Sequence, residues 1–79
     1  MMVKVRVFGY LKKYCSREAS KPFECALSEH ATGRDLVALL GLPAEEDLIL
    51  VVNNVNAQDK EILLHEHDEV SIYPYLGGG

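Results

Sequence analysis

The chain has 79 residues and a formal net charge of −4, because 12 acidic residues outnumber 8 lysines and arginines. This length allows one domain with one modest core. The acidic balance argues against a nucleic-acid partner, which requires a basic surface.

Membrane insertion and export are also disfavoured. No apolar run approaches the roughly 20 residues of a membrane span, and the opening M-M-V-K-V-R-V alternates charges with valines where a signal peptide is continuously apolar. We therefore expect a cytoplasmic protein that does not act on membranes. Cys15 and Cys25 are too few for a disulfide framework and form no C-x-x-C metal pair. We expect Cys25 to be a small buried hydrophobe and Cys15 to be a free thiol in a polar loop.

The N-terminal third predicts two strands. The stretch M-V-K-V-R-V-F alternates valines with basic residues, which is typical of a half-buried strand over about residues 2–8. Gly9 ends it, and Leu11 and Tyr14 in the following polar segment have a spacing that fits a helical turn. The stretch F-E-C-A-L, from Phe23 to Leu27, alternates again. We expect it to be the hairpin partner of the first strand.

The stretch T-G-R-D-L-V-A-L-L-G-L-P predicts a helix of about nine residues that begins at Thr32. Thr32 and Asp35 have the spacing of a capping box. Leu36, Leu39 and Leu40 form an i, i+3, i+4 stripe that should face the core. The glycine and proline that follow come in the order expected at a helix C-terminus.

The C-terminal half predicts further strands. Leu48–Val52 is a continuous run of β-formers, typical of a strand that is covered on both faces or central in a sheet. Asn53-Asn54 should turn the chain, because Asn tolerates positive φ, and residues 55–62 should make a short irregular return. The last strand, Val70–Tyr75, alternates between two faces.

These elements indicate an α+β fold in which a small mixed sheet of four to five strands packs on one main helix. One sheet face then stays open, and Phe8, Tyr73 and Tyr75 are candidates for it. We expect the following core side chains: Val3, Val5, Val7, Leu36, Leu39, Leu40, Ile49, Val51, Val70 and Ile72.

The whole chain resembles the ubiquitin-like sulfur carriers of the β-grasp fold, the MoaD/ThiS type. It is most similar to the small subunits of molybdopterin synthase. The motifs are the opening V-K-V-R-V-F-G-Y-L-K-K-Y, the helix from Thr32, the strand end V-V-N-N, and the ending L-x-x-x-D-E-V-x-I-Y-P-x-L-G-G-G. This chain has Glu66-His67 where the family usually has Asp-Gly, and Tyr75 where a second proline is common. Three final glycines also occur in sulfur carriers for thiamine synthesis.

The resemblance implies a β-grasp domain over residues 1–75 and a functional tail over 76–79. The tail would consist of the anchor Leu76 and the flexible Gly77, Gly78 and Gly79. An extended four-residue tail spans roughly 13 Å, and glycines lack the Cβ that would block a narrow channel. A ubiquitin-activating type of adenylyltransferase would adenylate the Gly79 carboxylate, and a sulfur donor protein would convert it to a thiocarboxylate.

The partner implied next is the large subunit of molybdopterin synthase, or thiazole synthase in the thiamine alternative. The chain would bind no cofactor itself, since ATP and Mg²⁺ belong to the activating partner, and it would be a protein co-substrate rather than an enzyme. Phe8, Tyr73, Pro74 and Tyr75 are the candidate partner interface. Whether molybdenum or tungsten lies downstream, and the oligomeric state, are left open by the residues.

Three other interpretations compete. A non-catalytic ubiquitin-like interaction domain would bind partners without the tail, and a modifier would ligate Gly79 to lysines. The stretch His65-x-His67 suggests a metal site, but no third ligand is indicated. We expect a solvated turn there and no metal.

Overall fold

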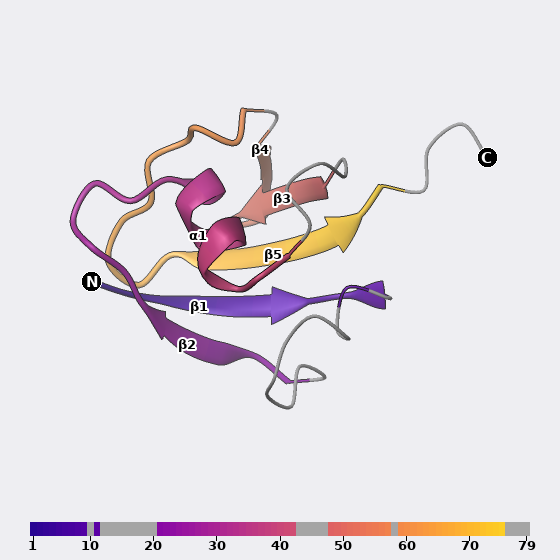
Figure 1. Ribbon diagram of the computed structural model, residues 1–79, viewed down its shortest axis with the longest axis horizontal. Helices are drawn as coiled ribbons and strands as arrows, with labels where there is room; N and C mark the ends of the chain where they lie inside the picture. Colours follow the sequence, from indigo (N-terminus) through magenta and orange to yellow (C-terminus); the bar gives the residue numbers. More distant parts are fainter. Residues whose placement is uncertain (10, 12–20, 43–47, 58, 76–79) are drawn as a thin grey trace.

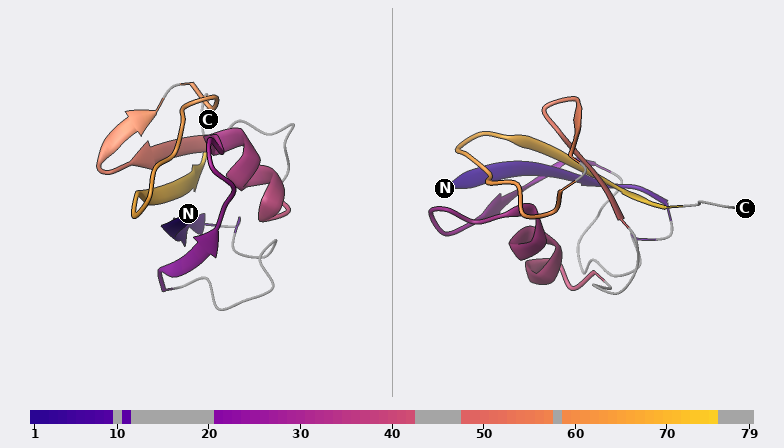
Figure 2. Two further views of the ribbon diagram at one scale, coloured as in Figure 1. Left: turned by 90° about the vertical axis from the view of Figure 1, so that its left-hand side faces the viewer. Right: turned by 90° about the horizontal axis from the view of Figure 1, so that it is seen from above.

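The computed structural model describes residues 1–9, 11, 21–42, 48–57 and 59–75. These residues form a mixed sheet of five strands with one helix against one face (Figures 1 and 2). The predicted α+β architecture is confirmed. The elements in chain order are β1 (Met2–Val7), β2 (Phe23–Ala26), α1 (Gly33–Leu39), β3 (Leu48–Val52), β4 (Val55–Ala57) and β5 (Glu69–Pro74).

The last strand of the chain occupies the centre of the sheet. The strand order is β2-β1-β5-β3-β4, so β5 lies between the first strand and β3. It runs parallel to β1, with Val5 opposite Val70, and antiparallel to β3, with Leu50 opposite Ile72. The antiparallel pairing of β1 with β2 confirms the predicted hairpin partnership.

The core lies between the sheet and α1. Alternation along β1 and β5 turns the valines of β1, Val70 and Ile72 toward the helix, as predicted. Cys25 is buried as expected, whereas Cys15 and Tyr14 lie outside the described residues. The sequence analysis did not assign Leu11, Leu42 or Leu64 to the core, although all three are buried.

Strand β3 corrects the prediction that Ile49 and Val51 belong to the core. Leu48, Leu50 and Val52 are buried, whereas Ile49 and Val51 are half-buried on the opposite face of the sheet. A continuous apolar run gives no sign of which alternate residues face the helix, and the prediction chose the wrong set. The strand is interior in the sheet, as one of the two predicted alternatives has it, because β5 and β4 pair with its two sides. The helix α1 covers one face of the sheet.

The helix presents a different stripe from the predicted one. Its buried residues are Gly33, Leu36 and Val37, while Leu40 is half-buried and Leu39 is 59% exposed. Spacings of three and four from Gly33 reach Leu36 and Val37, so Leu39 lies off this face by about 100°. The prediction that Leu39 belongs to the core is therefore wrong.

The start of α1 follows the predicted capping box. The Thr32 hydroxyl accepts from the Asp35 N–H at 3.2 Å, and the Asp35 carboxylate accepts from the Thr32 N–H at 2.9 Å. The next N–H groups of the first turn donate to carbonyls of the segment before β5: Gly33 to Ile62 at 3.0 Å and Arg34 to Lys60 at 2.8 Å. The helix is thus joined to that segment by its otherwise unpaired donors.

A buried carboxylate joins the β3–β4 turn to the start of β5. Asp68 is 9% exposed and accepts from the His65 N–H at 2.8 Å and from the Asn53 amide at 2.9 Å. Asn53 in turn accepts from the Glu69 N–H at 2.9 Å. Asn53 and Asn54 have φ of 51° and 68°, which confirms the predicted turn.

His67 occupies the position where the resembled family has glycine, and its φ is 68°. A side chain in this left-handed region costs roughly 1–2 kcal/mol relative to ordinary backbone. The chain therefore has a left-handed turn residue at position 67 without the glycine that best fits it.

Gly33→Ala should lower the free energy of unfolding by about 1–3 kcal/mol, measured by urea denaturation, because it overpacks the core. A Cβ at Gly33 would lie 2.6 Å from Cδ1 of Leu50, which is fully buried, and 3.1 Å from the Lys60 carbonyl oxygen. Leu50→Val removes one carbon from the crowded side chain. The double variant should then lose less stability than the sum of the two single variants, and strict additivity would contradict the proposed clash.

His67→Gly should raise the free energy of unfolding by about 0.5 kcal/mol. Relief of the left-handed backbone outweighs the extra freedom that glycine gives the unfolded chain. His67→Ala is the matched control, since it removes the imidazole but keeps a Cβ at φ 68°. Equal stabilisation by both variants would show that the imidazole, not the backbone, is responsible.

Candidate functional site

The candidate site is the end of β5, where the chain leaves the sheet. The Phe8 N–H donates to the Ile72 carbonyl at 3.0 Å. In a parallel ladder the Phe8 carbonyl would next accept from the N–H of residue 74. That residue is Pro74, which has no N–H. Pairing between β1 and β5 therefore ends at a defined residue, five positions before the end of the sequence.

Gly9 makes room for this exit. Its φ is +66°, and a Cβ there would lie 2.9 Å from Cγ of Pro74. A glycine is required for both reasons, because other residues disfavour this φ and would collide with the proline ring. Gly9 ends β1 as predicted, and it also allows the two strand ends to approach closely.

The rings of Phe8 and Tyr73 stack across the same strand ends. Their centroids are 4.4 Å apart and their planes differ by 8°. Both rings are half-buried. Their neighbours Val7 and Ile72 are buried toward the helix, so alternation along the strands places the rings on the opposite face of the sheet. The Arg6 guanidinium carbon lies 5.9 Å from the centroid of Phe8, within cation–π range. The stack therefore joins the first and last strands through side chains just where their backbone pairing ends.

Neighbouring strands extend these rings into an apolar surface, here called the open-face patch, formed by Phe8, Tyr73, Ile49 and Val51. Ile49 is opposite Tyr73 in the register of β3 with β5. Val51 is opposite Ser71, which lies two residues before Tyr73 on the same strand. All four patch residues are half-buried. The sequence analysis assigned Ile49 and Val51 to the core, and only the register with β5 reveals that they adjoin the aromatic pair.

Charged side chains border the open-face patch. Lys4 is opposite Glu69 on β5 and Glu24 on β2, and Arg6 is opposite Ser71. Within the part of the chain that the structure describes, neither Lys4 nor Arg6 forms an ion pair. A shallow depression of about 360 Å³ runs beside them, with Phe8 and Tyr73 in its lining. The surface therefore offers an apolar centre with charged groups of both signs at its border, a composition suited to protein contact.

The predicted interface residues have three different environments. Phe8 and Tyr73 form the stack, Pro74 lies against Gly9, and Tyr75 is 55% exposed beyond the strand. The predicted tail residues Leu76, Gly77, Gly78 and Gly79 lie outside the described residues. The structure thus describes the chain up to Tyr75, the residue before the predicted tail.

The two histidines of the predicted solvated turn approach different acids. Nδ1 of His65 lies 3.8 Å from Asp68, and Nδ1 of His67 lies 3.8 Å from Glu66. Both imidazoles are largely exposed. Among the residues with described positions, no group of three or more His, Cys, Asp or Glu side chains is arranged to hold a metal ion. Within the same ranges no helix is long and apolar enough to cross a membrane.

The family model described as Mut7-C ubiquitin matches residues 1–77. The chain belongs to this family. The resemblance to ubiquitin-like proteins of the MoaD/ThiS type is therefore confirmed at the level of the ubiquitin-like family. A comparison with curated proteins gave no match.

Solved structures support the fold of this family member. Two crystal structures of small archaeal modifier protein 1 from Haloferax volcanii are similar to it. One has a TM-score of 0.71 at 18% identity and covers 100% of both chains. The other has a TM-score of 0.72 at 17% identity and covers 95% of this chain and 98% of the modifier. At these identities the likeness shows a shared ubiquitin-like β-grasp fold.

The aromatic stack should contribute a measurable coupling energy. The test is a double-mutant cycle of Phe8→Ala and Tyr73→Ala. The loss of unfolding free energy in the double variant should differ from the sum of the two single losses by about 0.5–1.5 kcal/mol, since stacked rings interact beyond their burial. Urea denaturation of the four proteins measures this term. Phe8→Ala with Val55→Ala is the matched control, because β5 and β3 separate those residues. A coupling energy as small as that of the control pair would contradict an energetic role for the stack.

Proposed function

We propose that this protein is a sulfur carrier whose Gly79 carboxylate is adenylated and then converted to a thiocarboxylate. The observation that carries the proposal is the exit of the chain at Pro74, followed by Y-L-G-G-G. Three glycines without side chains, two residues after a central strand, suit delivery of a carboxylate into a partner's narrow active site. The family match and the shared fold support a ubiquitin-like carrier or modifier.

The chemistry needs little from this chain beyond the carboxylate. A carboxylate oxygen of Gly79 attacks the α-phosphate of ATP in the activating partner, which forms the acyl-adenylate and releases pyrophosphate. Sulfide then attacks the acyl carbon and expels AMP, which leaves a thiocarboxylate and a proton. The partner supplies the Mg²⁺ and the residues that stabilise charge. The chain is a co-substrate in this scheme, and the scheme requires that the Gly79 carboxylate be free.

Within this function, we place the chain as the small subunit of molybdopterin synthase, with the large subunit as acceptor partner. Pro74 and the full-length resemblance favour this branch, while the third glycine favours the thiamine branch and thiazole synthase. The open-face patch and Arg6 would contact the partner, since both lie at the base of the tail. Contact there would position the tail before it enters the active site.

A second candidate is a protein modifier that is ligated to lysines through the same carboxylate. The two similar crystal structures support this candidate, because both are structures of a protein called a modifier. Both functions begin with an acyl-adenylate. They differ in the nucleophile, which is sulfide for the carrier and a lysine amine for the modifier.

Intact-mass measurement tests the carrier directly. The 79-residue chain, incubated with a ubiquitin-activating type of adenylyltransferase, ATP, Mg²⁺ and sulfide, should gain the mass of one sulfur-for-oxygen exchange. The matched control is the chain that ends at Gly77, which should gain nothing because its carboxylate no longer reaches the adenylating centre. A gain by the shortened chain, or none by the full chain, would contradict the proposal. Higher-mass conjugates that survive thiol reduction would indicate the modifier instead.

A further inference from the structure

A second surface of the molecule lies at the opposite side of the sheet from β4, along strand β2. In the strand order β2 is terminal, and among the described residues no strand pairs with its outer side (Figure 1). An edge strand presents peptide groups to which another chain can pair.

The register shows which peptide groups of β2 point outward. Leu27 and Met1 exchange both backbone hydrogen bonds, each at 2.7 Å. Doubly bonded pairs alternate along an antiparallel ladder, so the peptide groups of Glu24 and Ala26 point away from β1. The hydrogen bonds of β1 support this assignment. Lys4 is the partner of Glu24, and its N–H points away from β2 and donates to the Asp68 carbonyl at 2.8 Å.

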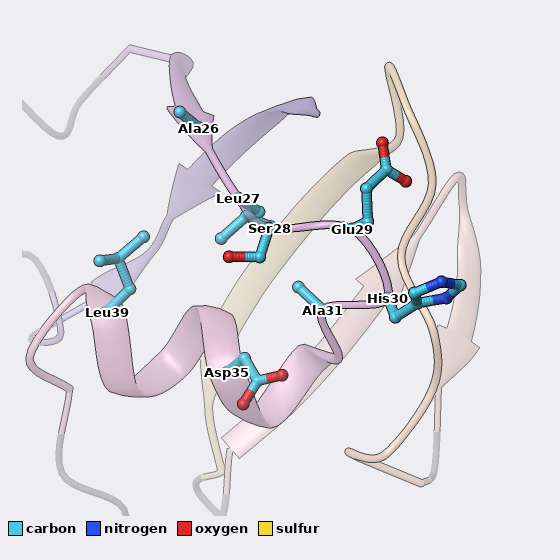
Figure 3. Close-up of a pocket in the computed structure, with 8 residues that line it drawn as sticks. All are labelled: Ala26, Leu27, Ser28, Glu29, His30, Ala31, Asp35 and Leu39. Carbon is cyan, nitrogen blue, oxygen red and sulfur yellow. The ribbon is translucent and has the colours of Figure 1, made fainter.

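A groove continues from this edge toward the helix. It has a volume of about 260 Å³ and lies between the segment Ala26–Ala31 and α1, where Asp35 and Leu39 line it. Figure 3 shows Leu39 on the helix, across from Leu27 and Ser28 at the end of the strand. The exposed Leu39 thus forms an apolar wall of the groove together with Leu27 and Ala31.

The charges on this surface define the chemistry of an occupant. Glu29 and Asp35 line the groove, His30 adjoins them, and no lysine or arginine is among its described lining residues. Glu24 lies on the open face of the edge strand, where its partner on β1 is Lys4. Strand β1, which pairs with the inner side of β2, alternates valines that face the helix with basic residues that lie on the open face of the sheet.

We propose that the outer edge of β2 and the adjoining groove bind an extended segment of a partner protein in which apolar residues alternate with lysine or arginine. The segment adds as a strand and pairs with the peptide groups of Glu24 and Ala26. Its apolar side chains face the groove beside Leu39, and its basic side chains lie on the open face next to Glu24. Glu29 and Asp35 at the groove do not contact these basic side chains but add a negative field that favours a segment of positive net charge. The groove shares no lining residue with the open-face patch, so the chain can hold this segment while that patch contacts another partner.

Titration with synthetic peptides tests the proposal. The probe is an acetylated and amidated K-V-K-V-R-V-K, added to the ¹⁵N-labelled 79-residue chain and followed by amide chemical shifts and hydrogen exchange. We expect the Glu24 and Ala26 amides to shift and to exchange more slowly, because they gain hydrogen bonds. A scrambled K-K-V-V-V-R-K and an acidic E-V-E-V-E-V-E should bind at least about tenfold more weakly, which corresponds to about 1.4 kcal/mol.

Two pairs of variants locate the binding surface. Ala26→Pro removes an outward N–H, and Leu39→Lys adds a like charge to the groove wall; each should weaken binding of K-V-K-V-R-V-K about tenfold or more. The matched controls are Asn56→Pro and Val55→Lys on the opposite edge strand β4, where Val55 is 67% exposed. Both should leave binding unchanged, and amide spectra of all four variants establish that they remain folded.

Several results would overturn the proposal. These are unchanged Glu24 and Ala26 amides at millimolar peptide, equal binding of the acidic or scrambled peptide, or equal effects of the β2 and β4 variants. Concentration-dependent shifts of the same amides without peptide, with a dimer in sedimentation, would also overturn it, since the occupant would then be a second copy of this chain. None of these outcomes depends on sulfur transfer, so this proposal and the proposed function can fail independently.

Discussion

The parallel pairing of the first and last strands is the constraint on which the rest of this structure depends. Because β5 lies between β1 and β3, the end of the chain is held by backbone bonds on both sides until Pro74. A parallel pair cannot be closed by a tight turn, so the chain between β1 and β5 must form the crossover, and it contains the helix that covers the core. The capping box fixes the start of α1 within that crossover, and the Asp68 hydrogen bonds fix its last turn before β5. Central placement of β5 therefore sets the position of Pro74 relative to the core.

The same topology separates two surfaces. The open-face patch lies over the central strands next to the exit, where the Phe8–Tyr73 stack replaces the backbone bond that Pro74 cannot make. The outer edge of β2 and its groove lie beside the helix, at one end of the strand order. A small domain with a 79-residue chain has little room for an enclosed active site. The functions proposed here therefore use exposed faces, an edge and a tail, which are suited to partner proteins rather than to small substrates.

Sequence patterns predicted the elements where alternation or capping was explicit. In β1 the valines alternate with basic residues, so the strand and its buried face followed directly. Thr32 and Asp35 marked the helix start, and both capping bonds are present. In β3 every residue is apolar, and the pattern contained no information about which set faces α1. Leu39 was misplaced for a related reason: four apolar residues in five positions allow two stripes, and packing of Gly33 against Leu50 selects the one that leaves Leu39 exposed.

The sequence by itself determined the class of fold, the positions of most strands, the helix cap and the family resemblance, because these depend on local periodicity and on motifs with fixed spacing. The tertiary structure alone decided the strand order, the stacking of Phe8 on Tyr73, the place of Ile49 and Val51 beside that stack, and the exposed edge of β2. Each of these joins residues that are far apart in the chain. Their contacts depend on register, and register follows from the pairing of whole strands rather than from the residues of any one of them.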